Sequence, residues 1–368
     1  MNVAISAMRT KNIRINRHEL VTSILKSGHS VTYIGQESED RIHPDYEKYN
    51  VKFLGIPLGR SNINPLKELH TIIETRKLLK ENNIEAIIIY GIRTFPSIVL
   101  AAKLAGIKKV ICIVNGTGRL FQMDGLKGLI VKGFSYPMLV VSFLLSNSIL
   151  FQNKDDLKMI QNKKLLWNKN YNIVNGSGVN LDEFESLELN RKPTFLMISR
   201  ITGSKGVNEF IQAAVKVKKL YKNATFYLVG PMDDGDSSLD NELFSFAIKM
   251  KIIIYKGEVN DVKPIIEMSR VVVLPSYSEG MPRTVLEGMA MGRPIITTDT
   301  PGCRETVLDG VNGFLIPPRN SLQLAEKMIE MINDPERVVV MGKNSRRLCE
   351  DKFDVHKVNR EIINKLHE

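Results

Sequence analysis

Short, unbroken runs of β-branched and aliphatic residues alternate with helical stretches along this chain, in two successive series. Strands that are apolar on both faces and are spaced by helices are typical of parallel βαβ units, whose sheet is covered on both sides. The pattern therefore predicts an α/β fold built on doubly wound parallel sheets. The expected strands are Val3–Ser6, Ser30–Ile34, Val51–Leu54, Ala86–Tyr90, Val110–Val114, Ile149–Phe151, Tyr171–Val174, Thr194–Ser199, Thr225–Val229, Ile252–Tyr255, Val271–Leu274, Ile295–Thr298 and Phe314–Ile316.

The series begins again at Thr194, so the 368 residues divide into halves of similar length. We expect a Rossmann-like N-terminal domain at residues 1–175 and a Rossmann-like C-terminal domain at residues 176–368. The segment Asn175–Pro193, rich in Asn, Gly, Ser and acidic residues, is the expected link, and the C-terminal helix is able to pack back on the first domain. Ligands of such sheets bind outside the carboxyl ends of the strands, which predicts a cleft between two facing domains.

The net positive charge of the chain comes entirely from its first half. Residues 1–175 contain 25 basic and 13 acidic residues, whereas the remainder contains 26 and 27, and the whole chain has a net charge of +11. Such an asymmetry favours an anionic partner for the first half, namely nucleic acid, anionic lipid or a phosphorylated substrate. A lysine-rich solubilising surface would give the same balance.

One stretch, residues 133–153, is uncharged and as long as a membrane span. Pro137 lies inside it, and Ser146-Asn147-Ser148 divides it, so we expect a buried helix followed by a buried strand. Just upstream, Leu126–Lys132 mixes lysines with aliphatic residues and could touch a lipid headgroup layer without crossing it. Trp167 is expected to be partly buried.

The segment that follows the expected strand Val271–Leu274 carries the most chemistry. Glu279 leaves the carboxyl end of that strand, and a helix is predicted to begin near Arg283 and to end at Gly292. Free N–H groups at a helix start form an anion site that suits a diphosphate. Glu287, eight residues after Glu279, offers a second carboxylate, the usual partner of ribose hydroxyls. This arrangement indicates a nucleotide-sugar site.

Two cations follow the first strand of the second half, in Ser199-Arg200-Ile201-Thr202-Gly203-Ser204-Lys205-Gly206. Arg200 and Lys205 at the carboxyl end of a strand would neutralise a diphosphate without a metal ion. An exposed lysine loop is the alternative interpretation of this pattern.

These motifs together resemble a known family, the retaining glycosyltransferases of family 4, which have the GT-B fold. The resemblance covers essentially the whole second half. The segments that carry it are Arg200/Lys205, Glu279-x7-Glu287, Gly292-Arg293-Pro294-Ile295-Ile296, Pro301-Gly302-Cys303-Arg304-Glu305 and Gly310-Val311-Asn312-Gly313-Phe314-Leu315-Ile316-Pro317-Pro318.

The resemblance implies roles for these residues. Arg200 and Lys205 would hold the donor diphosphate and stabilise a UDP leaving group. Glu279 would orient the donor sugar, and Glu287 would hold the ribose. The remaining donor contacts would come from Gly280, Met281, Pro282, Arg283 and Thr284 for sugar and phosphate, and from Gly257 and Glu258 for the base. Retention in this family is usually explained by front-face attack, with a donor phosphate oxygen taking the proton of the acceptor.

A narrower branch of the family is suggested by the first half, through Ile63-Asn64-Pro65-Leu66, Val114–Arg119 and Asn175–Asn180. That branch adds N-acetylhexosamines, typically α-1,3-linked GalNAc, to undecaprenyl-diphosphate-linked saccharides in bacterial glycan assembly. The substrate-binding loop implied here is Asn115, Gly116, Thr117 and Gly118. Many relatives have a histidine where Asn115 stands, and an asparagine cannot act as a general base at neutral pH.

The resemblance thus implies transfer of a hexosamine, GalNAc or GlcNAc, from a UDP-sugar to a polyprenyl-diphosphate-linked saccharide of an O-antigen, capsule or glycoprotein glycan. The enzyme would lie at the cytoplasmic face of the cell membrane, peripherally, with its basic N-terminal domain against anionic lipid. No cofactor and no metal are expected, because Cys112, Cys303 and Cys349 are far apart, the histidines are isolated, and Asp234-Gly235-Asp236 reads as a solvated loop.

Two other classes of protein remain open. A UDP-sugar 2-epimerase of the same fold would need a cluster of catalytic carboxylates and histidines, which the sequence does not suggest. A basic nucleic-acid-binding protein would need interleaved aromatic residues or a known binding module in the first half, and neither is evident, so no nucleic-acid partner is expected.

Overall fold

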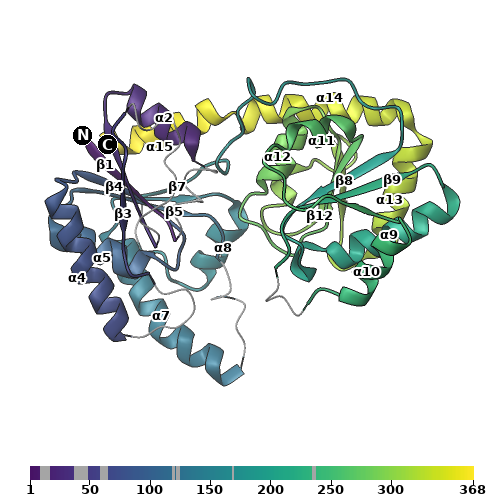
Figure 1. Ribbon diagram of the computed structural model, residues 1–368. Coiled ribbons are helices and arrows are strands. Elements are labelled where there is room, and N and C mark those ends of the chain that lie inside the picture. The colour runs from purple at the N-terminus through teal and green to yellow at the C-terminus, as the bar shows by residue number, and fades with distance from the viewer. Residues whose placement is uncertain are drawn as a thin grey trace. The chain divides into compact units, whose positions relative to one another are not determined.

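The computed structural model describes residues 1–8, 17–36, 49–58, 65–117, 121, 125–167, 170–233 and 238–368. These residues form two α/β units (Figure 1). The first unit contains Met1–Ser177 together with Val355–Glu368, and the second contains Gly178–Asp354. The chain therefore returns to the first unit for its last helix.

In the first unit, the described strands form one sheet in the order β3-β2-β1-β4-β5-β6-β7, and every pair of neighbours is parallel. The strands are β1 (Asn2–Ser6), β2 (Ser30–Gly35), β3 (Lys52–Gly55), β4 (Ala86–Tyr90), β5 (Lys109–Val114), β6 (Ser148–Phe151) and β7 (Tyr171–Ile173). The helices are α2 (His18–Lys26), α4 (Pro65–Glu81), α5 (Phe95–Ala105), α7 (Gly125–Leu145), α8 (Lys154–Asn162) and α15 (Val355–His367).

Helices cover both faces of this sheet. Successive residues of a strand point to opposite sides, so a single strand contributes to the core on each face. Ile88 of β4 packs in a core cluster with residues of α2 and α15, whereas its neighbours Ile87 and Ile89 pack in a separate cluster with residues of α4, α5, α7 and α8. The two clusters are the two faces of a doubly wound sheet (Figure 1). This explains why its strands are continuous apolar runs in the sequence.

The last helix, α15, belongs to the first unit because of its amphipathic pattern. Val355, Val358, Ile362 and Leu366 are buried and recur at helical spacing. Val358, Ile362 and Leu366 pack in the same cluster as the buried residues of α2. Asn359 Nδ2 also donates to a hydroxyl of that helix, Ser23 Oγ, at 3.4 Å.

In the second unit, the described strands form a parallel sheet in the order β10-β9-β8-β11-β12-β13. The strands are β8 (Thr194–Ile198), β9 (Thr225–Val229), β10 (Ile254–Tyr255), β11 (Val271–Leu274), β12 (Ile295–Thr298) and β13 (Gly313–Ile316). The helices are the 3₁₀ turns η1 (Gly203–Lys205) and η2 (Arg304–Thr306), and α9 (Val207–Leu220), α10 (Asn241–Lys249), α11 (Lys263–Met268), α12 (Arg283–Ala290), α13 (Ser321–Asn333) and α14 (Pro335–Lys352). The predicted α/β class and the two doubly wound parallel sheets are confirmed.

A fully buried arginine ties the segment leading into the second unit to its core. Arg293 is 0% exposed, and its guanidinium donates to the carbonyls of Ile266, Leu187, Glu188 and Glu267 at 2.9 to 3.3 Å. Burial lowers the pKa of this guanidinium to about 10. The four carbonyls accept most of the hydrogen bonds that a guanidinium can donate, which compensates for its burial. The side chain therefore holds the segment around Leu187 against the core of the unit.

Two sequence expectations about burial were wrong. The helix α7 was expected to be buried, yet only 28% of Gly128–Leu145 lies inside the structure. Trp167, expected to be partly covered, is 67% exposed. In both cases the sequence shows an apolar side chain but cannot show whether a neighbouring element covers it.

Candidate functional site

The candidate site lies at the carboxyl edge of the second sheet, where the strand order reverses. From β8 the chain proceeds outward to β9 and β10, and from β11 it proceeds the other way to β12 and β13. Neighbouring strands β8 and β11 are thus the topological switch point, the place where doubly wound sheets bind ligands. The loops after these two strands, residues 199–206 and 275–282, carry several of the residues that the sequence singles out.

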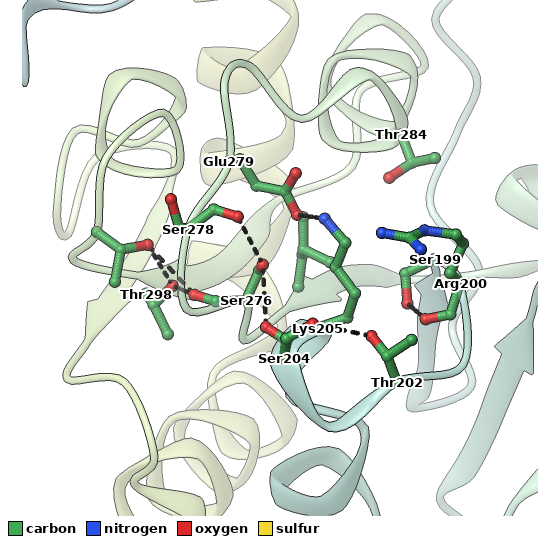
Figure 2. A network of polar contacts seen from close by, with 12 residues as sticks. Ser199, Arg200, Thr202, Ser204, Lys205, Ser276, Ser278, Glu279, Thr284 and Thr298 are labelled. Carbon is green, nitrogen blue, oxygen red and sulfur yellow. Dashed lines mark hydrogen bonds and ion pairs between the residues drawn. The ribbon is translucent and has the colours of Figure 1, made fainter. Parts of the chain in front are cut away.

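An ion pair joins the two loops. Lys205 Nζ donates to Glu279 Oε1 at 2.6 Å, and the two side chains are 19% and 15% exposed (Figure 2). The pair is therefore shielded from bulk water but open enough for an exchange of partners. The attraction between the two charges is screened less than in a fully exposed pair, and the cost of desolvating both groups opposes this gain.

The two loops touch through their backbones at a glycine. Gly206 has a φ of +80°, and a Cβ at this position would lie 2.1 Å from the carbonyl oxygen of Pro275. The N–H of Tyr277 donates to the carbonyl of Ser204 at 3.0 Å. A glycine is required here both for the left-handed backbone and for the close approach, and this contact sets the position of Lys205.

A third loop, which follows β12, contacts the backbone of Glu279. The N–H of Glu279 donates to the carbonyl of Pro301 at 3.1 Å, and a Cβ on Gly302 would lie 2.4 Å from the carbonyl oxygen of Glu279. Next to it, Cys303 is completely buried, and burial raises its pKa to about 11, with the charge of Glu279 as a further cause. The loop that carries Glu279 is therefore held by the loop after β8, through Tyr277, and by the loop after β12, through Glu279 itself.

The helix α12 places the second predicted carboxylate. Arg283 Nε donates to Glu287 Oε1 at 2.8 Å, one turn further along the helix. Thr284 Oγ1 donates to the carbonyl of Ile198 at 3.1 Å, which ties the start of the helix to the end of β8. Pro282 occupies the N-cap position without a side-chain hydrogen bond to the helix, and the first N–H groups of a helix have no intrahelical acceptor. The helix start thus lies at the switch point, as an anion site requires. Gly280 and Met281 are half-buried in the loop that leads into it.

The other predicted cation, Arg200, has a partner that the sequence did not indicate. Arg200 Nη1 donates to Asp233 Oδ2 at 2.7 Å, and the Arg200 side chain is 60% exposed. Asp233 follows β9, the neighbour of β8, so the pair links two loops of the same sheet edge. The segment Asp234-Gly235-Asp236 lies outside the described residues.

The predicted base-binding residues follow β10. Gly257 has a φ of +68°, and its carbonyl accepts from the N–H of Gly230 at 2.8 Å. A Cβ on Gly230 would in turn lie 1.8 Å from the carbonyl oxygen of Ser199. These close backbone approaches bring the loops after β8, β9 and β10 together, with Glu258 exposed beside them.

In the first unit, the predicted substrate loop follows β5, with Asn115 exposed, Gly116 half-buried and Thr117 buried. Thr117 Oγ1 donates to Asp156 Oδ1 at 3.3 Å, and Asn153 Nδ2 donates to Asp156 Oδ2 at 2.8 Å. Burial raises the pKa of Asp156, and these hydrogen bonds offset part of that effect.

Sequence reasoning missed Asp156, although Asn153 three residues before it is a helix N-cap signature. Gly118, the last member of the predicted loop, lies outside the described residues.

Within the described part of the chain, no three or more His, Cys, Asp or Glu side chains come together as a metal site. The groups found at this edge of the second sheet are instead an ammonium, two guanidinium groups, the three carboxylates that pair with them, and a helix start.

The two doubly wound parallel sheets have the fold of the GT-B class, and comparisons with known proteins show a likeness to glycosyltransferases. Residues 180–348 match the family model "Glycosyl transferases group 1". HepE of Anabaena, solved in complex with UDP, superimposes with a TM-score of 0.78 over 100% of both chains, at 16% identity. Sucrose-phosphate synthase of Thermosynechococcus elongatus gives a TM-score of 0.78 over 100% of this chain and 98% of the other, at 15% identity.

Two relatives with assigned activities extend over both units. One is the N,N'-diacetylbacillosaminyl-diphospho-undecaprenol alpha-1,3-N-acetylgalactosaminyltransferase of Campylobacter jejuni, 28% identical over 309 residues, which is 80% of each chain. The other is the UDP-Gal:alpha-D-GlcNAc-diphosphoundecaprenol alpha-1,3-galactosyltransferase of Escherichia coli, 27% identical over 85% of this chain and 83% of the relative. The predicted resemblance is therefore confirmed.

Proposed function

We propose that this chain is a retaining glycosyltransferase that moves a hexosamine, GalNAc or GlcNAc, from a UDP-sugar to an undecaprenyl-diphosphate-linked saccharide. The observation that carries the proposal is the Lys205–Glu279 pair at the switch point, next to the start of α12. Two relatives named for transfer to diphospho-undecaprenol saccharides support the acceptor class. The product would be part of a bacterial surface glycan or a glycoprotein glycan.

The donor would bind in the second unit. Lys205 and Arg200 would neutralise its diphosphate, and Arg283, Thr284 and the backbone at Gly280 would surround the sugar and phosphate. In the structure Lys205 and Arg200 are engaged by carboxylates. A diphosphate would compete with Glu279 for the Lys205 ammonium, and the released carboxylate would then accept hydrogen bonds from donor sugar hydroxyls.

The ribose and the base would lie to either side. Glu287 is buried one turn into α12, and its carboxylate would accept hydrogen bonds from the two ribose hydroxyls. Gly257 and Glu258 follow the edge strand β10 and would meet the base through their backbone.

The transfer itself needs few groups from the protein. The bond between the sugar C1 and the UDP phosphate oxygen breaks, and a bond from C1 to the acceptor hydroxyl oxygen forms on the same face. The acceptor proton passes to an oxygen of the departing phosphate. Lys205 and Arg200 stabilise the negative charge that develops there, which is the role that a divalent metal plays in other phosphate sites. We therefore propose a reaction that is independent of metal ions and cofactors.

The first unit would bind the acceptor. Its excess of basic residues suits a lipid diphosphate and an anionic membrane surface. Asn115 is exposed after β5 and can hydrogen-bond a sugar hydroxyl through its side-chain amide, with Gly116 and Thr117 shaping the loop. We place the enzyme at the cytoplasmic face of the membrane, as a peripheral protein.

The test combines a donor screen with two variants. Purified protein is incubated with UDP-GalNAc, UDP-GlcNAc, UDP-galactose or UDP-glucose and a short-chain undecaprenyl-diphosphate saccharide, with and without EDTA. NMR of the product gives the linkage and the anomeric configuration. We expect an α-linked hexosamine product that forms in EDTA. Lys205→Ala and Glu287→Ala should abolish transfer, whereas Lys222→Ala, an exposed lysine outside the site, should not.

Near-normal turnover in both site variants would refute the assignment. An inverted product would refute retention, and loss of activity in EDTA would refute metal independence. Incubation with UDP-GlcNAc alone, watched for the epimer, tests the 2-epimerase alternative directly.

A further inference from the structure

The solvent side of α7 is apolar along most of its length. Ile130, Phe134, Pro137, Val141 and Leu144 are exposed, and their spacing of four, three, four and three residues places them on one stripe, the outer stripe of α7. Ile130 is 66% exposed and Phe134 is 46% exposed. A surface helix normally presents charged and polar residues on this side. The outer stripe needs an apolar environment that the described part of the unit does not supply.

The opposite side of α7 holds the helix on the first unit. Leu139 and Phe143 are buried, and the Phe143 ring meets Phe95 of α5 edge-on, with 6.0 Å between the ring centroids. Ser142 is on this buried side, where its hydroxyl donates to the carbonyl of Met138 at 2.7 Å. The helix is therefore apolar on its outer side as well as on the side that packs on the unit.

The packing of α7 on the first unit opposes a membrane-spanning arrangement of this helix. Gly128–Leu145 is the one stretch of helix in the described chain that is long and apolar enough to span a membrane. Its inner side, however, packs on α5, and β6 resumes the sheet three residues after the helix ends. Spanning would require the unit to come apart, whereas lying in the interface would use the outer stripe as it stands.

Charge favours lipid over a second copy of the chain. Lys127 and Lys132 are the charged residues of α7, both lie near its beginning, and residues 125–145 contain no Asp or Glu. Residues 1–175 as a whole have the basic excess described above. An anionic bilayer complements this charge, whereas a second copy would bring the same positive excess against itself.

We propose that the outer stripe of α7 inserts into the interface of an anionic bilayer, with the helix lying along the membrane and Lys132 at the headgroups. Because α7 follows β5, it begins at the carboxyl edge of the first sheet, the edge at which Asn115 is exposed. The membrane would then present a lipid diphosphate at that edge, a consequence that rests on the proposed function.

The experiment measures binding of the whole chain to vesicles of phosphatidylethanolamine and phosphatidylglycerol by flotation. The test variant is Ile130→Gln with Phe134→Gln, since glutamine keeps the helix propensity and the net charge. The matched control is Leu220→Gln with Phe246→Gln, which are 69% and 50% exposed on helices of the second unit. We expect the test variant to bind vesicles at least about tenfold more weakly and the control to bind as wild type.

A second measurement does not depend on a loss of binding. Trp167 is the only tryptophan of the chain, so Phe134→Trp in a Trp167→Phe background reports on the outer stripe alone. Its fluorescence should be quenched by lipids brominated on the acyl chains. Absence of quenching in vesicle-bound protein would overturn the proposal, as would unchanged flotation of the glutamine variant with an unchanged melting temperature. A dimer in light scattering that becomes a monomer in the glutamine variant would assign the stripe to a second copy instead, and would also overturn it.

The readouts separate this inference from the proposed function. The glutamine variant should retain turnover on a water-soluble short-chain acceptor and lose turnover on a long-chain acceptor in vesicles. If no sugar is transferred by the wild type but vesicle binding still depends on Ile130 and Phe134, the membrane surface stands and the proposed function fails. If sugar is transferred but vesicle binding does not depend on Ile130 and Phe134, the proposed function is supported and the proposed membrane surface is refuted.

Discussion

Lys205 and Glu279 are 74 residues apart in the sequence, and their side chains meet at 2.6 Å across the switch point of the second sheet. One is the cation proposed for the donor diphosphate, and the other is the carboxylate proposed for the donor sugar. The ion pair that joins the two loops is thus the one that the donor would separate. The fold is therefore stabilised when the two side chains stay paired, whereas donor binding requires them to separate.

Substitution of the pair should distinguish its effect on the free energy of unfolding from its effect on kcat/KM. Lys205→Met or Glu279→Gln alone leaves the other charge without its partner, which should lower the free energy of unfolding by about 1–3 kcal/mol. The double variant removes both charges and should lose less than the sum of the two. All three variants should lose at least about 100-fold in kcat/KM, because the donor then lacks its cation, its carboxylate or both. Urea unfolding and steady-state kinetics measure the two effects, and strictly additive losses of stability would contradict the pairing.

Gly206→Ala should impair donor binding through the backbone. The variant has to adopt a φ of +80° and also pushes a methyl group against the carbonyl of Pro275. Gly28→Ala is a matched control, since Gly28 has a φ of +79° with nothing within 4 Å of its Cβ position. The control should lose about 1 kcal/mol from backbone strain alone. Gly206→Ala should lose more and should raise the KM for the donor; equal losses in the two variants would show that the loop contact is unimportant.

Asp156 should give the first unit a distinct pH dependence. Its pKa is raised above the ordinary value of 3.8, chiefly by burial. A raised carboxyl pKa stabilises the folded state at low pH, and that contribution is lost as pH rises through the folded pKa. The stability of wild type relative to Asp156→Asn should therefore be greatest in acid and decline toward neutral pH. Urea unfolding of both proteins across this range measures the difference, and a difference that grows with pH would contradict the assignment.

Arg293→Met should destabilise the second unit strongly. It removes the guanidinium donor from the carbonyls of Leu187, Glu188 and Glu267, while the carbonyl of Ile266 keeps the N–H and hydroxyl of Ser269 as donors. We expect a loss of about 3–5 kcal/mol in the free energy of unfolding, because several hydrogen bonds from a charged donor are lost together. Arg191→Met, an exposed arginine near the same segment, should change it by less than about 0.5 kcal/mol. Guanidinium unfolding followed by circular dichroism makes the comparison, and similar curves for the two variants would rule out a supporting role.

Much of the fold could be predicted because its determinants are local. Ala86–Tyr90 and Val271–Leu274 read as buried parallel strands from composition alone, and both are central strands of the sheets. Helix α12 begins at Arg283, as predicted, and Gly292, with a φ of +77°, follows its end. Capping, periodicity and the residues after strand ends are properties of neighbouring residues in the chain.

The partners of the site residues could not be predicted in this way. The sequence offered Arg200, Lys205, Glu279 and Glu287 as candidates, but it did not indicate that Arg200 pairs with Asp233. These contacts depend on which strand ends become neighbours in the sheet, and that order is set by long-range packing.

By itself, then, the sequence determined the alternation of strands and helices and the chemical character of the loops that follow them, because each is encoded within a few adjacent residues. Only the tertiary structure decided which loops meet, which charges pair and which apolar side chains remain uncovered. Ile130 on α7 and Ile87 on β4 are alike in the sequence, yet one is 66% exposed and the other is buried. The reason is that burial is a property of the elements packed around a residue, not of the residue itself.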